Sequence, residues 1–447
     1  MQKSFFVAFF ILSALTVTSF AQEPAQSRSK RERVVIVGQK DQTAEPETSP
    51  TPSKVLVVED NTPKPQPTPV RAPIPVDKPE KPTVIVGSTS KPASPTTAPI
   101  TPAQSLPYRT MSFGQIKSKI AEAKRQMQAR PLPTGLTDSF LITDVIRIAF
   151  HDWDTGQLDY AVMTKESFLS KDSDVRTTST NGKQITIRTI RGNGVNTPVL
   201  IFDSQNKAHL PLLVQYPIEK GGRYIETAYY VSTHPGIVNP EVVSAGAMYI
   251  RNTIDIARDK LRQKGIFIQP RIADMAEKLA TVEHVDHYRF RTEYHPNIFN
   301  DIFTLYALNE GQTYRYSVSS AGAGGMVQMI PSTYRMIRSR YPQVGLMPDF
   351  VEGMRDHVNA AQAMLLYMQM TWNDLIASPV VAQALESGIA TDEELMAAGY
   401  NSNPARLPGY IKRGGPGWKN LIPRETKIYL QITESLNKHV PFKPRTR

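Results

Sequence analysis

A single glutamate precedes a run of very small residues in the C-terminal half of the chain. Glu310 ends the apolar stretch "IFNDIFTLYALNEG", and residues 319–325 read "SSAGAGG". A carboxylate at the end of an apolar helix loses hydration, which favours its protonated form nearer neutral pH. Glycosidic cleavage needs such a general acid, and residues without bulk let the backbone approach a large ligand closely. A helix end followed by a flexible glycine turn would give the same pattern.

The stretch around Glu310 resembles the core motif of the soluble lytic transglycosylases. In that motif a catalytic Glu stands nine residues before a Ser and twelve before Gly-Ala, and Gly-Leu-Met-Gln then leads into Met-Pro. The same spacing is held here by Glu310, Ser319, Gly322, Ala323, Gly325, Gln328 and Pro331. Two later segments, "MAAGYNSNPARL" and "IPRETKIYL", are similar to further motifs of the family and supply Tyr400, Asn401, Glu425, Thr426 and Tyr429. The resemblance covers about residues 271–436.

The resemblance implies a lysozyme-like helical domain and a role for each matching residue. Glu310 would act as general acid and then as base. The substrate-binding residues would be Ser319, Met326, Gln328, Tyr400, Asn401, Glu425 and Tyr429. Ser319 and Gln328 would hydrogen-bond polar groups of the sugar, Met326 would form an apolar floor, and Tyr429 would hydrogen-bond Glu310. Loop bracing and helix packing are the alternative roles for these positions.

The family usually has Ser directly after the catalytic Glu, where this chain has Gly311. That departure puts one hydrogen bond near the acid in doubt. His284 and His287 are three residues apart, but no third ligand follows at a matching spacing, so the sequence predicts no metal site and no cofactor.

Ordinary glycosidases use two carboxylates, and no second one is apparent beside Glu310. In peptidoglycan, the C6 hydroxyl of N-acetylmuramic acid can attack the C1 of the same sugar, which removes that need. In line with this, the resemblance implies a lytic transglycosylase that cleaves the β-1,4 bond between N-acetylmuramic acid and N-acetylglucosamine and leaves a 1,6-anhydro end. A hydrolytic muramidase and a non-catalytic peptidoglycan-binding or scaffolding protein stay open as alternatives.

The elements that must position these residues change character along the chain. Residues 139–236 contain five strand-like segments, "VIRIAF", "KQITIRTI", "PVLIF", "HLPLLVQY" and "RYIETAYYVST", which predict an all-β domain, either a sandwich or a small barrel. An amphipathic helix and linker precede it at 108–138, with Ser112 as the expected N-cap of the helix and Gln115 closing a capping box. A connecting helix is expected over 237–269, because Asn239 suits its N-cap and Gly265 its end. A helical catalytic domain follows at 270–437, with one helix over about 271–287, and a basic tail at 438–447.

The N-terminal quarter predicts export and a tether. Residues 1–21 have the layout of a cleavable secretory signal, and an uncleaved anchor is the alternative. Residues 22–107 contain no aromatic residue and 17 of the 36 prolines, which is typical of a disordered tether. Three short Val/Ile islands in it could add to a partner's sheet edge, so an envelope protein partner is one option. Degenerate spacer sequence is the alternative for these islands. The net charge of +11 is diffuse, which argues against nucleic acid and fits a periplasmic or envelope location.

Overall fold

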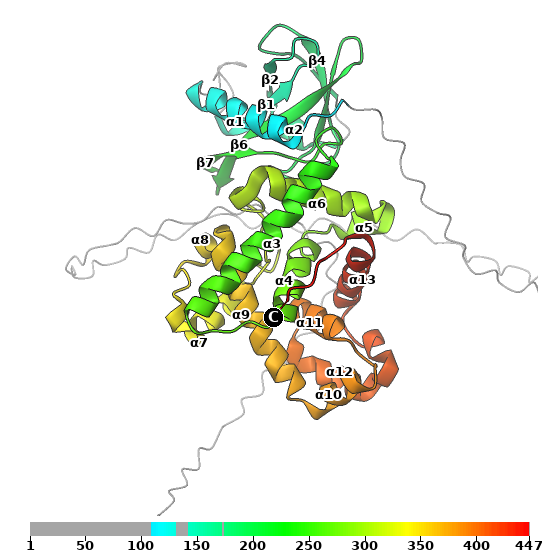
Figure 1. Ribbon diagram of the computed structural model, residues 1–447. Coiled ribbons are helices and arrows are strands. Elements are labelled where there is room, and N and C mark those ends of the chain that lie inside the picture. Colours follow the sequence, from blue (N-terminus) through cyan, green and yellow to red (C-terminus); the bar gives the residue numbers. More distant parts are fainter. Residues whose placement is uncertain (1–108, 131–141, 172–173, 447) are drawn as a thin grey trace, which may run out of the picture.

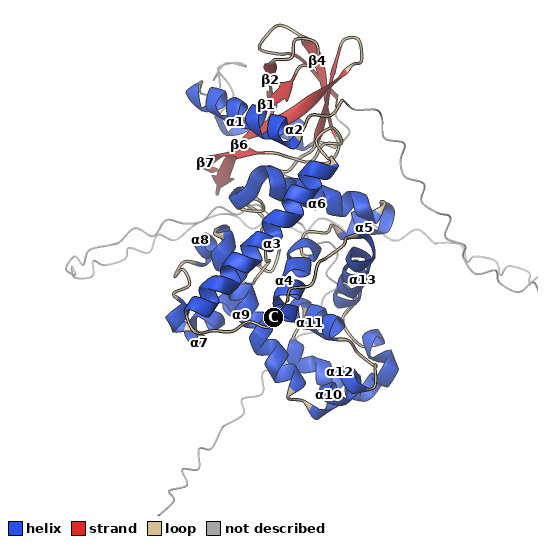
Figure 2. Ribbon diagram, in the orientation of Figure 1, coloured by secondary structure: helices blue, strands red, loops and turns tan. Residues whose placement is uncertain are grey.

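The computed structural model describes residues 109–130, 142–171 and 174–446 (Figures 1 and 2). The predicted signal peptide, the tether and most of the predicted linker lie outside these residues. Most of the described chain falls into two parts, which we call the β module (residues 142–230) and the helical module (residues 240–446). Among these residues no helix combines the length and the hydropathy needed to cross a bilayer.

The β module is a strongly curved antiparallel sheet of seven strands in the order β2-β1-β6-β5-β4-β3, with β7 paired to β6. The backbone N–H of Thr180, just after β3, donates to the carbonyl of Tyr160 in β2 at 2.8 Å, so the two ends of the sheet nearly meet. The all-β prediction is confirmed, in its small-barrel form. The strands are β1 (Val145–His151), β2 (Leu158–Thr164), β3 (Asp174–Thr178), β4 (Gln184–Thr189), β5 (Val199–Asp203), β6 (Ala208–Lys220) and β7 (Arg223–Tyr230).

Side chains along β1 point alternately to the two faces of the sheet, so both faces of the barrel wall are covered by apolar packing. Ile146, Ile148 and Phe150 face the main hydrophobic cluster, whereas Ala149 faces a second cluster made with helix α1 (Phe113–Ala129). The expected capping box of α1 is present, with Ser112 as N-cap. A short helix, α2 (Lys165–Leu169), follows β2. Figure 1 shows α1 lying across the strands of the β module.

The helical module begins with the expected connecting helix, α3, whose N-cap is Asn239. Figure 1 shows α3 running from the β module into the helical module, toward α7. The remaining helices gather around α4 and α9. The bounds are α3 (Pro240–Gln263), α4 (Pro270–Val282), α5 (His287–Thr292), α6 (His295–Asn309), α7 (Pro331–Arg340), α8 (Phe350–Arg355), α9 (His357–Ile376), α10 (Pro379–Glu386), α11 (Asp392–Asn401), α12 (Leu407–Gly414) and α13 (Arg424–His439).

Helix α4 ends five residues before the expected position, for a local reason. Asp286 accepts hydrogen bonds from the backbone N–H groups of Tyr288 and Arg289 and so caps a new helix, α5. The chain therefore turns between Val282 and His287. This turn leaves Glu283 at the end of α4, as its C-cap residue.

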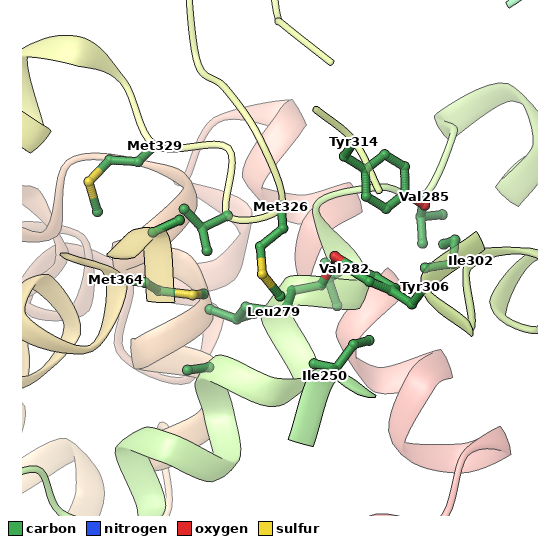
Figure 3. Close-up of a cluster of buried hydrophobic side chains, with 14 of the residues drawn as sticks. Ile250, Leu279, Val282, Val285, Ile302, Tyr306, Tyr314, Met326, Met329 and Met364 are labelled. Carbon is green, nitrogen blue, oxygen red and sulfur yellow. Dashed lines mark hydrogen bonds between the residues drawn. The ribbon is translucent and has the colours of Figure 1, made fainter. Parts of the chain in front are cut away.

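The two modules share one hydrophobic core. The main cluster is continuous from Ile146 in β1 to Leu436 in α13. Figure 3 shows its centre, where Leu279, Val282, Met326 and Met364 pack together. The side chain of Asn309, at the end of α6, exchanges two hydrogen bonds of 2.8 Å with the backbone of Val231, just after β7. The modules are thus joined by apolar packing and by satisfied polar groups.

The predicted basic tail is packed rather than free. Residues 440–446 follow α13, and the side chain of Arg445 is only 4% exposed. Its guanidinium contacts Asp255 of α3 at 2.6 Å, and Asp274 and Glu277 of α4 at 2.9 and 2.6 Å. A buried arginine that meets three carboxylates fastens α3 to α4.

Candidate active site

A cleft of about 420 Å³ opens in the helical module. Most of its walls come from two segments, the loop and helix start at residues 319–333, and the end of α11 with the turn after it. Helix α4 contributes one residue at its end and α9 contributes one. The lining residues are Glu283, Ser319, Ala321, Ala323, Gln328, Met329, Ile330, Thr333, Tyr367, Tyr400, Asn401, Ser402, Asn403 and Pro404.

Glu283 carries the carboxylate of this cleft. It follows the last residue of α4 in a relaxed helical conformation, with φ −59° and ψ −19°, and its backbone N–H donates to Leu279. The residue is half-buried. The hydroxyl of Tyr429, on α13, donates to Oε1 of Glu283 at 2.8 Å. Because Tyr429 is 2% exposed, this bond holds the carboxylate in one place.

Tyr400 closes the cleft beside the same acid. Its hydroxyl donates to the carbonyl of Val327 at 2.7 Å, and its ring meets Tyr367 edge-on with centroids 5.9 Å apart. Removal from water, and then the negative charge of Glu283, raise the pKa of Tyr400 well above its usual value. The phenol therefore stays protonated and acts as a fixed donor. Thr426 on α13 donates to the side-chain oxygen of Asn401 at 2.9 Å, which orients this lining amide.

The loop that forms one wall of the cleft is hydrogen-bonded to His284, the residue that follows Glu283. His284 lies buried beneath the loop, and its Nε2 donates to the carbonyl of Met326 at 2.9 Å. Its ring stacks on Tyr314 with centroids 3.4 Å apart. Since Met326 and Val327 are neighbours, His284 and Tyr400 donate hydrogen bonds to adjacent carbonyl groups of the loop. The wall and the acid are thus positioned together.

Ser319 and Gln328 line the cleft and also brace the loop. The hydroxyl of Ser319 accepts from the backbone N–H of Ala323 at 3.0 Å. The amide of Gln328 donates to the carbonyl of Gly325 at 2.8 Å. The backbone of Gln328 has φ 47°, in the left-handed region, which is strained for any residue other than glycine. The same two side chains therefore both line the cleft and brace the loop.

The small residues divide into two groups with different neighbours. Ala321 and Ala323 face the cleft. Gly325, with φ +66°, faces α8, where an added Cβ would lie 2.3 Å from the carbonyl oxygen of Met354. The lack of bulk therefore serves two needs, open space in the cleft and close packing of the loop against α8.

The expectation that Glu310 is a dehydrated acid in this cleft is wrong. Its side chain is 52% exposed, it pairs with Lys117 of α1, and it is not among the lining residues. The C-terminal end of α6 points to α1 and the β module instead of to α11 and α13. Glu310 also has φ 46° and ψ −126°, a conformation that residues with side chains rarely adopt.

Three other expected site residues have roles in the structure that differ from the predicted ones. Met326 is fully buried in the core with Leu279 and Met364, so it packs the loop and does not floor the cleft (Figure 3). Tyr429 does hydrogen-bond a glutamate, but the partner is Glu283 and not Glu310. Glu425 is exposed in the first turn of α13 and is not a lining residue.

The structure brings Ser319, Gln328, Tyr400 and Asn401 together, with Tyr429 behind them, around an acid that the sequence reasoning missed. The fixed nine-residue spacing led to the nearest upstream glutamate, whereas α5 and α6 intervene between the true lining acid and the loop. A usable signal was present, because Glu283 follows the amphipathic segment "IADMAEKLATV" and ends it as Glu310 ends α6.

A second group of metal-ligating side chains lies in the β module, away from the cleft. Asp152, Asp154 and His209 approach within 4.8 Å of one another. Lys183 already pairs with both carboxylates at 2.8 Å, and Lys207 pairs with Asp154. The ammonium groups occupy the place that a metal cation would take, so this cluster reads as an ion-pair network.

Comparisons of the chain with protein-family models, curated proteins and solved structures found no match. The residues of the cleft and their geometry are therefore the basis for assigning a function.

Proposed function

We propose that the protein is a peptidoglycan lytic transglycosylase whose acid is Glu283. The observation that carries the proposal is the make-up of the cleft. Among its fourteen lining residues, all of them described, Glu283 is the only carboxylate, and it is held by Tyr429 next to Tyr400, Asn401 and Gln328. Ser319, Gln328, Tyr400 and Asn401, four of the residues singled out in the sequence, thus share the cleft with one acid.

A lone acid favours chemistry in which the substrate supplies its own nucleophile. Glycosidases that hydrolyse with a pair of carboxylates need the second as base or nucleophile. In the proposed reaction, Glu283 donates its proton to the glycosidic oxygen as the C1–O bond of N-acetylmuramic acid breaks. The C6 hydroxyl of the same sugar then bonds to C1 and gives its proton to Glu283. The products are an N-acetylglucosamine end and a 1,6-anhydro end, and no water is consumed.

The surrounding residues would position the sugar. Intramolecular attack gains a large effective concentration when the sugar is held in the reactive geometry. Gln328, Ser319 and Asn401 offer amide and hydroxyl groups to the sugar, while Tyr400 keeps the wall in place through Val327. The N-terminal sequence predicts export, which would bring the enzyme to a peptidoglycan substrate in the envelope.

Mass spectrometry of the released muropeptides tests the proposal. The protein without its signal sequence should release fragments that end in 1,6-anhydro-N-acetylmuramic acid, and Glu283→Gln should bind the glycan but release none. Products 18 Da heavier, the mass of one water molecule, would show a hydrolytic muramidase in its place. Binding without any release by the unsubstituted protein would favour the scaffolding alternative.

A further inference from the structure

Two tyrosines line the cleft, and their hydroxyl groups differ in what they contact. Tyr400 donates to the carbonyl of Val327 at 2.7 Å, so its hydroxyl holds the wall. Within the part of the chain that the structure describes, the hydroxyl of Tyr367, on α9, has no hydrogen-bond partner. Its oxygen is not fully enclosed by the protein, so it meets the open space of the cleft.

The other polar side chains of the cleft almost all have a hydrogen bond to the protein. Beside the acid, such bonds engage Ser319, Gln328, Tyr400, Asn401, Ser402 and Asn403. Among the lining residues, all of them described, Thr333 in the first turn of α7 is the second one whose side chain lacks such a bond. A structural hydrogen bond therefore explains most of these side chains but not Tyr367.

The ring of Tyr367 is held in place without the help of its hydroxyl. It packs against the main hydrophobic cluster and meets Tyr400 edge-on, with centroids 5.9 Å apart. Tyr400 lies close to the acid as well, because after burial the charges of Glu283 and Tyr367 raise its pKa further. Burial also raises the pKa of Tyr367, so this phenol stays protonated and can both donate and accept. A largely buried tyrosine hydroxyl usually has a partner.

We infer that Tyr367 is a substrate-binding residue, whose hydroxyl forms a hydrogen bond with the sugar held beside Glu283. This inference rests on the proposed function, because it takes the ligand to be a glycan strand of peptidoglycan. Binding sites fix a ligand through a few well-placed polar groups on an apolar wall, and the hydroxyl and acetamido groups of the sugar match a phenol. Tyr400 and Tyr429 then hold the wall and the acid, while Tyr367 contacts the substrate.

Binding without turnover tests the inference. The protein without its signal sequence, as Glu283→Gln alone and as Glu283→Gln with Tyr367→Phe, is titrated with peptidoglycan glycan strands in a calorimeter. We expect Tyr367→Phe to weaken binding roughly three- to tenfold, the range for one neutral hydrogen bond. The urea midpoint of unfolding should stay the same, since no protein group loses a partner. Equal affinity of the two proteins, or no binding by either, would overturn the inference.

Two more tyrosine variants separate substrate contact from packing. Tyr341→Phe is the matched control, because Tyr341 is also partly buried against the main cluster and lies outside the cleft. Within the described chain its hydroxyl has no partner either, so its removal should leave the affinity unchanged. Tyr400→Phe should instead lower the midpoint of unfolding, because the carbonyl of Val327 loses its donor. A loss of affinity in Tyr341→Phe equal to that in Tyr367→Phe would contradict a specific contact.

The reaction itself is measured separately from binding. If the unsubstituted protein releases no anhydro fragments while Tyr367→Phe weakens binding, the proposed reaction fails and the assignment of Tyr367 stands. If fragments are released while Tyr367→Phe changes neither the affinity nor KM, the reaction stands and the assignment of Tyr367 is wrong.

Discussion

Glu283 and Glu310 each follow the last residue of a helix that is largely buried, yet they lie in different surroundings. The end of α4 meets α11 and α13, and Glu283 is half-buried there with Tyr429 as its donor. The end of α6 meets α1, and Glu310 is 52% exposed and paired with a lysine. The apolar character of a helix thus says little about its terminal acid. The burial and the partner of the acid depend on the element that packs against that end of the helix.

The largest expected difference between the two acids is in turnover. Glu283→Gln should lower the rate of muropeptide release by roughly 10²–10⁴-fold, the range for loss of a general acid. Glu310→Gln should change it by less than about twofold, because an exposed, ion-paired side chain outside the cleft touches no substrate. Release rates measured at equal protein concentration decide this. An inactive Glu310→Gln variant beside an active Glu283→Gln variant would contradict the assignment of the acid to Glu283.

A second difference concerns Gly325, in the loop that forms one wall of the cleft, and Gly311, which directly follows Glu310. Gly325→Ala should destabilise the protein by about 3 kcal/mol, because φ +66° is strained for alanine and the new Cβ would lie 2.3 Å from a backbone oxygen. Gly311→Ala should shift the unfolding free energy by less than about 0.5 kcal/mol, since the nearest atom is a tyrosine hydroxyl 3.8 Å away. Urea unfolding followed by circular dichroism measures both. Equal midpoints would contradict the packing of the loop against α8.

The hydrogen-bond partner of Glu283 gives a smaller effect. Tyr429→Phe removes the donor to Oε1 of Glu283 and should lower kcat roughly tenfold with little change in KM, since a hydrogen bond to a charged group contributes about 1.5–3 kcal/mol. A shifted pH–rate profile would separate this positioning role from simple loss of stability. If the profile keeps its position and only the thermal midpoint falls, Tyr429 acts through packing alone.

The ion-pair partner of Glu310 gives the smallest effect. Lys117→Met should change the unfolding free energy by less than about 1 kcal/mol, because both side chains of this pair are about half exposed. Turnover should be unchanged. A loss of activity with Lys117→Met at constant stability would show that α1 and Glu310 act on the cleft after all.

Local signals in the sequence predicted the elements well where the chain carries caps and alternation. The capping box of α1 and the Asn239 cap of α3 are where the sequence put them. Strands β2 and β3 were missed, because "LDYAVMT" follows a tight turn without glycine pairs and "DVRTT" is short and largely exposed at the sheet edge. Four of the expected substrate residues do line the cleft. The acid could not be chosen from spacing, since α5 and α6 separate it from the loop and only tertiary packing shows which helix end faces α13.

The continuous core that joins the two modules has a consequence for dissecting the protein. A polypeptide reduced to α3–α13 would lose the apolar partners that β1, β6 and β7 supply, including Ile146, Tyr216 and Tyr230. It would also leave the amide of Asn309 without the backbone of Val231. Such a fragment should expose apolar surface and aggregate. The barrel is in this sense an internal folding partner of the helices, and swapping it for an unrelated domain would sacrifice the stability of the region that holds the cleft.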